Sequence, residues 1–352
     1  MSNQRTALPY RVTLGLALAL LAGCRAPARE PGAMPGAHPN HPHWRSPAEL
    51  PVEEVPPELK VAFIGDQGLG RDARAVLEMI AAEGAQAVLH QGDFDYDDDP
   101  AAWEEQLDEA LGRDFPYFVS PGNHDVEAWD GADGYQARIA ARYERLGIPW
   151  RGDAGELCAI RWRGLLLLFT SPGVFDDDED GEVAAAFIRD ELARDQASRW
   201  RICSWHKNQH RMQTGNKKDE TGWGPYEASR RGGAIVATGH EHAYSRSHLL
   251  ASCEEQVVAS ADSPLQLAID DPATPADEGR TFVFVSGIAG KSIRDQRRGG
   301  DWWAAVSTRD KGAQPGALFG VFNHQGDPGL ARFYFKEVGG RIVDEFLVRA
   351  PR

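Results

Sequence analysis

Five short, mostly apolar segments of this chain each run directly into a loop that carries Asp, Asn or His. The segments span residues 60–65, 85–90, 117–120, 200–205 and 234–238. Apolar runs of this length are typical of buried strands. In a sheet flanked by helices, ligands bind beyond the carboxyl ends of the strands. The pattern therefore predicts a sheet that gathers metal-binding side chains from five loops in one place.

Amphipathic segments separate the first three of these strands. Residues 71–83 and 100–112 each place apolar side chains at helical spacing. A further apolar strand at 165–170 is followed by a third such segment at 182–195. This alternation of strands and helices favours a sheet covered by helices.

The second half of the chain is predicted to be mostly β. Its expected strands span residues 244–250, 281–285, 318–323, 330–336 and 341–348. Residues 260–280 are polar and indicate a surface excursion. We therefore expect a single α/β domain over residues 58–352.

The N-terminus has the layout of a lipoprotein signal peptide over residues 1–23. Arg5 and Arg11 precede a short apolar run at 12–22, and Leu21-Ala22-Gly23-Cys24 resembles a lipobox. Lipid on Cys24 would tether an exported protein to a bacterial membrane, on the periplasmic or cell-surface side. A plain secretory signal and a short membrane anchor are the alternatives.

Residues 24–57 are rich in Pro, Ala, Gly and His and indicate a tether. His38, His41 and His43 could bind a metal there, although a solvated spacer is the commoner role of such a tract.

Three cysteines remain beyond Cys24, namely Cys158, Cys203 and Cys253. An odd number permits at most one disulfide, and burial as free thiols is equally compatible with the sequence.

The formal net charge of −15 argues against a nucleic-acid-binding surface, which usually needs a basic face. An acidic protein can still act on phosphates if metal ions supply positive charge locally.

Each polar motif is a weak signal by itself. Asp66 and Asp93 could each be turn or capping residues. Asn123, His124 and Asp125 follow a Pro-Gly turn and together are a stronger signal. The His240-x-His242 pair is stronger again, because alternation places both imidazoles on one side of an extended segment. The ordered set at successive strand ends is very unlikely by chance.

In order along the chain, these motifs resemble those of the calcineurin-like metallophosphoesterase superfamily. The resemblance runs from residue 60 to residues 238–245, and the fold extends it to residue 348. It implies the four-layer αββα fold of that superfamily, which is a two-sheet β-sandwich flanked by helices. The first motif usually has a His two residues after Asp66, where this chain has Gly68. The second motif has Tyr96 three residues after Asp93, as in the purple acid phosphatase branch, which residues 239–246 also resemble.

The resemblance assigns ligands for two metal ions. It places Asp66, Tyr96 and His242 on the first ion and Asn123, His206 and His240 on the second, with Asp93 bridging both. A bridging carboxylate offsets the repulsion between two cations about 3.5–4 Å apart. Phenolate suits Fe(III), and imidazole with amide oxygen suits Zn, Fe or Mn. An ordinary loop tyrosine is the alternative for Tyr96.

The implied activity is metal-dependent hydrolysis of phosphate esters, most of all phosphomonoesters of small molecules or peptides. His124 would protonate the leaving group or stabilise oxygen charge, and Asp125 would orient His124. His210 would contact the substrate phosphate, with Lys207, Lys217 and Lys218 in the same stretch available to attract anions.

Two departures leave the substrate open. Residues 204–209 lack the His-Arg-Pro run common in purple acid phosphatases, and residues 213–226 match no family signature. A phosphodiesterase on the same site, and a non-catalytic surface lipoprotein that keeps the fold, are the alternative functions.

Overall fold

The computed structural model describes residues 42–46, 49–175, 178 and 181–351. All of them belong to the compact unit Met34–Arg352. The other unit, Met1–Ala33, lies outside the described residues, and so do the predicted signal peptide and Cys24. Among the helices of the described part, none combines the length and the apolar character needed to cross a bilayer.

Two large sheets form the centre of this unit. Across the first sheet the order is β1 (Trp44–Arg45), β5 (Trp150–Asp153), β6 (Leu157–Trp162), β7 (Leu165–Phe169), β8 (Trp200–Trp205), β9 (Ile235–Thr238), β14 (Val283–Ser286), β10 (Tyr244–Ser247) and β15 (Trp303–Ser307). Across the second it is β13 (Leu265–Gln266), β18 (Ile342–Arg349), β17 (Leu330–Glu337), β16 (Gly316–Phe322), β2 (Leu59–Ile64), β3 (Ala87–Gln91) and β4 (Tyr117–Ser120).

Aromatic side chains join the two sheets face to face. Phe63 of β2 meets Phe284 of β14 edge to face, with ring centroids 5.3 Å apart. Phe282, just before β14, meets Phe333 of β17 at 5.7 Å in the same geometry. All four rings are fully buried, and such pairs stabilise packing beyond the area that they bury. The predicted two-sheet sandwich is confirmed.

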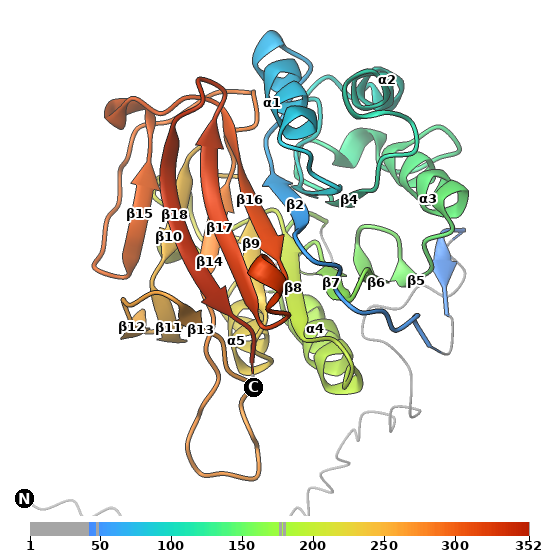
Figure 1. Ribbon diagram of the computed structural model, residues 1–352. Coiled ribbons are helices and arrows are strands. Elements are labelled where there is room, and N and C mark those ends of the chain that lie inside the picture. Colours follow the sequence, from blue (N-terminus) through green and yellow to red (C-terminus); the bar gives the residue numbers. More distant parts are fainter. Residues whose placement is uncertain (1–41, 47–48, 176–177, 179–180, 352) are drawn as a thin grey trace, which may run out of the picture. The chain divides into compact units, whose positions relative to one another are not determined.

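Helices lie outside both sheets (Figure 1). They are α1 (Arg71–Ala82), α2 (Pro100–Leu111) and α3 (Tyr135–Leu146), grouped near β2 and β4, and α4 (Glu182–Arg194) and α5 (Gly224–Arg231) near β8. Phe187 of α4 and Tyr226 of α5 form a buried cluster with Trp205 of β8. The predicted helices α1, α2 and α4 are confirmed, whereas α3 and α5 were not predicted.

Parallel pairing explains why the polar loops meet. Strands β2, β3 and β4 are parallel neighbours in the second sheet, and β7, β8, β9 and β14 are parallel neighbours in the first. The carboxyl ends of parallel neighbours lie at one edge of a sheet. The loops after β2, β3, β4, β8 and β9 are therefore brought to common edges.

Two predicted segments differ in detail. The strand expected at residues 244–250 is divided between β10 and β11 (Leu249–Ser252), and β11 pairs instead with β12 (Val257–Ser260). Part of the expected tether also pairs with the first sheet, since β1 lies next to β5 and Trp150 Nε1 donates to the carbonyl of His43. The domain boundaries themselves stay a prediction. Cys158, Cys203 and Cys253 are buried free thiols.

Candidate metal centre

The structure brings the predicted ligands together at the carboxyl ends of five strands. Asp66 follows β2, Asp93 and Tyr96 follow β3, Asn123 follows β4, His206 follows β8, and His240 and His242 follow β9. Two buried groups have ligand atoms within 4.8 Å of one another. The first is Asp66–Asp93–His242, and the second is Asp93–His206–His240. Asp93 belongs to both groups, which is the arrangement that a bridging carboxylate requires.

Tyr96 joins the first group, and its hydroxyl forms a nearly equilateral triangle with donor atoms of Asp66 and His242. The Tyr96 hydroxyl donates to Asp66 Oδ1 at 3.0 Å and lies 3.2 Å from His242 Nε2. His242 Nε2 lies 3.1 Å from the same Asp66 oxygen. Donors that are each about 2 Å from a common ion are separated by about 3 Å, so the triangle fits a metal ion.

The second group contains an acceptor without a partner. His206 Nε2 lies 3.2 Å from Asp93 Oδ1 and 3.0 Å from His240 Nδ1. Asn123 Oδ1 is buried and has no hydrogen-bond donor within the part of the chain that the structure describes. Leaving a buried acceptor unsatisfied costs about 1–3 kcal/mol, and a bound cation would remove that cost. The donors present therefore fit a second ion.

Contacts behind the imidazoles hold their ring nitrogens in place. His206 Nδ1 lies 2.6 Å from the carbonyl oxygen of Gln91, and His242 Nδ1 lies 2.6 Å from Ser292 Oγ. His240 Nε2 lies 3.1 Å from Glu220 Oε2. Each contact leaves the other nitrogen to face the cluster, as the outer partners of metal-binding histidines do. No sequence pattern indicated Ser292 or Glu220, because both stand in irregular segments.

The electrostatic balance also suits cations. Burial opposes the charge on Asp66 and Asp93, yet neighbouring imidazoles, His242 and His206 respectively, hold the pKa of each carboxyl below its usual range. Burial lowers the pKa of His240 to about 3, which keeps that imidazole neutral. Burial, Asp66 and Asp93 raise the pKa of Tyr96 far above its ordinary value. A phenolate at Tyr96 therefore requires a cation beside it.

Backbone strain concentrates at the cluster. Asp66, Asp93, Tyr96 and His240 have φ angles of 57°, 60°, 66° and 66°, a left-handed region that residues other than glycine rarely adopt. Each such residue costs about 1–3 kcal/mol and persists where its surroundings enforce it. Gly122 shows how tight the fit is, because a Cβ there would lie 2.2 Å from Asp93 Oδ1.

His124 lies at the exposed edge of the cluster. Its backbone N–H donates to Asp93 Oδ1 at 3.0 Å, and its ring centroid is 4.5 Å from that of Tyr96. The sequence led us to expect that Asp125 orients this imidazole. The buried Asp125 carboxylate instead accepts the backbone N–H groups of Asp93, Phe94 and Gly122, at 2.9, 2.8 and 2.6 Å. Asp125 thus connects the loop after β3 to the loop after β4, because its carboxylate accepts backbone N–H groups from both loops.

His210, the loop after β14 and Arg246 contact groups other than the donor atoms of the cluster. Gln209 Nε2 lies 2.9 Å from His210 Nδ1, so a phosphate contact of His210 stays a prediction. The loop after β14 contains Gly287 and Gly290 and continues to Lys291. It lies against the centre, since the Lys291 backbone N–H donates to the Asp66 carbonyl at 3.1 Å. Arg246 forms a bidentate ion pair with Asp344 of β18.

Comparison with known proteins agrees with this geometry. The sequence profile described as calcineurin-like phosphoesterase matches residues 59–244. No curated protein sequence matches the chain. A purple acid phosphatase, PPD1 from yellow lupin (Lupinus luteus) seeds, superposes with a TM-score of 0.60 at 15% identity, over 87% of this chain. A structure of PhoD superposes with a TM-score of 0.53 at 14% identity, over 86% of this chain and 72% of that one. The chain spans 55% of the length of the lupin protein. At such low sequence identities, the two superpositions show a shared fold.

Proposed function

This chain belongs to the calcineurin-like phosphoesterase family, and on that premise we propose that it hydrolyses phosphate monoesters at a centre of one Fe(III) ion and one divalent ion. Metal-dependent hydrolysis of phosphate esters follows from the family and from the clustered ligands. The observation that carries the finer proposal is the triangle of Asp66, Tyr96 and His242. The fold likeness to a purple acid phosphatase supports the same choice.

The proposed ligand sets follow the two groups around Asp93. Asp66, Tyr96 and His242 would hold Fe(III), since phenolate and carboxylate are hard anionic donors. Asn123, His206 and His240 would hold a divalent Zn, Fe or Mn ion. Such a pair of ions lowers the pKa of bound water and stabilises the charge of an in-line transition state.

The remaining chemistry falls to the protein's own side chains. His124 is exposed at the edge of the cluster, and its N–H contact with Asp93 fixes its backbone. Its imidazole is therefore placed to give a proton to a departing alkoxide. Asp125 acts as a positioning residue, because its three backbone contacts fix the loops that carry Asp93 and Asn123.

Tyr96→Phe is expected to abolish the visible absorption band of the iron-loaded protein. The band arises from charge transfer between phenolate and Fe(III), and Phe has no oxygen to bind the ion. Absorption spectra of the two iron-loaded proteins test this. Tyr334→Phe on β17 is the matched control. The Tyr334 hydroxyl donates to Glu83, which follows α1, so this variant should leave the band intact. A band that survives Tyr96→Phe removes Tyr96 from the centre.

His124→Ala is expected to lower turnover of an alkyl phosphate roughly a hundredfold, within the usual range for loss of a general acid. Metal content should stay that of the parent, because Ala keeps the backbone N–H bond to Asp93 and removes only the packing of the imidazole on the Tyr96 ring. Steady-state kinetics together with metal analysis check both points. His324→Ala, at the surface contact with Glu58, serves as the control. Loss of metal in the His124 variant would make His124 a ligand and contradict its proposed role.

A further inference from the structure

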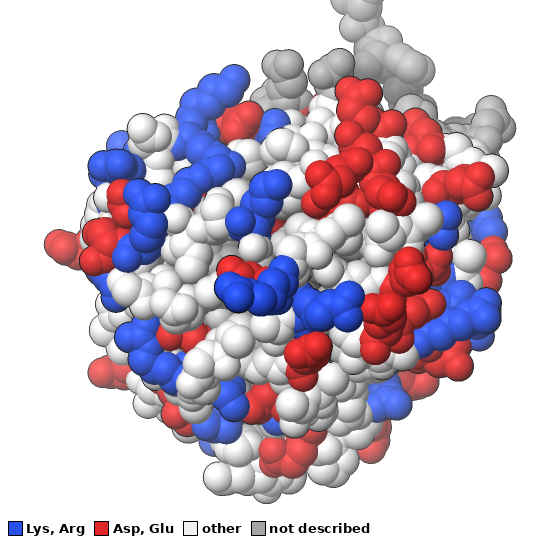
Figure 2. Space-filling view, turned by 90° about the horizontal axis from the view of Figure 1, so that it is seen from above, with Lys and Arg blue, Asp and Glu red and all other residues white. Residues whose placement is uncertain are grey.

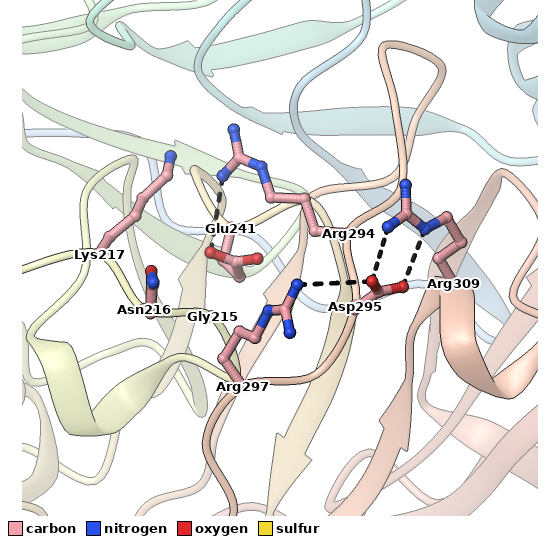
Figure 3. A pocket seen from close by; sticks show the side chains of 8 residues that line it. All are labelled: Gly215, Asn216, Lys217, Glu241, Arg294, Asp295, Arg297 and Arg309. Atoms are coloured by element: carbon pink, nitrogen blue, oxygen red, sulfur yellow. Dashed lines mark hydrogen bonds and ion pairs between the residues drawn. The ribbon is translucent and has the colours of Figure 1, made fainter.

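A pocket of about 310 Å³ opens beside the proposed metal centre (Figure 3). Six charged side chains line it: Lys217, Glu241, Arg294, Asp295, Arg297 and Arg309. They come from the irregular segment before α5, from the loop after β9, and from the stretch between β14 and the loop that follows β15. Neither the predicted ligands nor His124 line this pocket.

The wall of the pocket is the loop that carries two of the proposed ligands. Glu241 stands between His240 and His242 in the sequence. Lys217 Nζ and Arg294 Nη1 both donate to the carbonyl oxygen of His240, and Arg294 N donates to that of His242 at 2.8 Å. The pocket and the proposed metal centre therefore border the same loop.

The lining is cationic, with four basic side chains against two carboxylates. Asp295 accepts two hydrogen bonds from Arg309, at 2.8 and 2.6 Å, and lies 3.6 Å from Arg297 (Figure 3). Glu241 lies 3.6 Å from Arg294. Lys217 has no carboxylate partner among the residues that the structure describes. Positive charge is thus left over in the pocket, although the formal net charge of the chain is −15.

The surface charges are also separated (Figure 2). Lys and Arg side chains gather on the left of this face, and Asp and Glu gather on its right. The left is the side of β15, and the right is the side of α2. Segregation of this kind raises the local concentration of anions over the cationic part. The acidic composition therefore does not prevent an anion from approaching the pocket.

We propose that this pocket binds a second anionic group of the substrate, so that the preferred esters carry a carboxylate or a further phosphate on their alcohol part. The proposal rests on the phosphoesterase function proposed above. Guanidinium groups such as those of Arg294 and Arg297 present paired N–H donors that match carboxylate and phosphate oxygens. The pocket would then select the substrate, while the metal centre supplies the reaction.

The test compares ω-carboxyalkyl phosphates with hydroxyalkyl phosphates of two to five carbons, so that each pair differs in one charge. With the metal-loaded protein we expect kcat/KM to favour the carboxylate about tenfold at one chain length or more. The preference should fall as salt is added. In Arg294→Gln and Arg297→Gln, kcat/KM for the carboxylate should fall about tenfold more than for its neutral partner. Arg349→Gln removes an equal charge at the Asp327 surface pair and should keep the parent preference.

The outcomes separate the two proposals. Hydrolysis of neither series by the metal-loaded protein would overturn the proposed function. Hydrolysis of both series with equal kcat/KM at every length would overturn the pocket proposal alone. A preference that is unchanged in both arginine variants would assign the selectivity elsewhere and also overturn it. Metal content measured in each variant shows whether an altered preference comes from the pocket rather than from a damaged centre.

Discussion

Replacing Asp93 by Asn is expected to lower turnover roughly a thousandfold or more, since a bound ion supplies several kcal/mol of transition-state stabilisation and about 1.4 kcal/mol corresponds to tenfold. Asp93 is the residue that belongs to both candidate ligand groups. Asn keeps the shape of the side chain but loses the charge that offsets two neighbouring cations. Metal content should therefore fall below two ions per chain, as measured by elemental analysis beside steady-state kinetics.

The matched control is Asp97→Asn. It makes the same chemical change in the same loop, at an exposed carboxyl that is part of neither ligand group. This variant should keep the metal content and the turnover of the parent. If Asp93→Asn instead retained two ions and turnover within tenfold of the parent, Asp93 would not bridge the ions.

The second large effect is expected for Asn123→Ala, which should lose one of two ions and roughly a hundredfold or more in turnover. Loss of a residue that only hydrogen-bonds to a metal ligand typically lowers metal affinity or activity about 10–100-fold. Asn123 is proposed as a ligand itself, so its loss should have at least that effect. The structure adds a sharper expectation. Asn123 Oδ1 has no hydrogen bond to break among the described residues, so the metal-free variant should be as stable as the metal-free parent or slightly more stable.

Denaturant unfolding of the metal-free proteins checks this stability, and metal analysis checks the loss of the ion. Asn323→Ala provides the contrast, because Asn323 Nδ2 donates to the Val55 carbonyl at 2.8 Å. That variant should lose stability and keep both ions. If Asn123→Ala destabilised the metal-free protein while retaining two ions, Asn123 would be a structural residue.

The residues that were predictable are those tied to regular strands. An apolar run followed by Asp66, Asp93, Asn123, His206 or His240 indicates a strand that delivers a ligand, and parallel pairing brings such strand ends to a common edge. The two-sheet sandwich was predicted from the resemblance of these motifs to the metallophosphoesterase superfamily. The periodicity that marks these strands depends only on which side chains are buried, and the sequence carries that information directly.

The residues that were missed act through irregular backbone. Glu220 and Ser292 contact His240 and His242 from segments without periodicity, and the pocket residues Arg294 and Arg297 lie in the same kind of segment. Lys217 was noticed in the sequence, but nothing there placed it against the His240 carbonyl. The available signal for the pocket was the four basic residues among the eight from Lys291 to Arg298.

Asp125 shows a different limit of the sequence. Its position beside His124 suggested a contact between the two side chains, yet its carboxylate is directed at three backbone amides. The loop after β3 takes left-handed backbone angles at Gly92 and Asp93, directly beside the Asp93 and Phe94 N–H groups that Asp125 accepts. A sequence pattern does not report such backbone angles, and so it could not identify those partners.

The most direct test of the two-metal centre is elemental analysis of the purified protein, read beside hydrolysis of an aryl phosphate monoester and the matching diester. We expect about two ions per chain, one of them iron, and faster hydrolysis of the monoester that is lost on chelation and restored by metal. A well-folded, metal-free protein that binds no ions when iron and zinc are supplied would contradict the account.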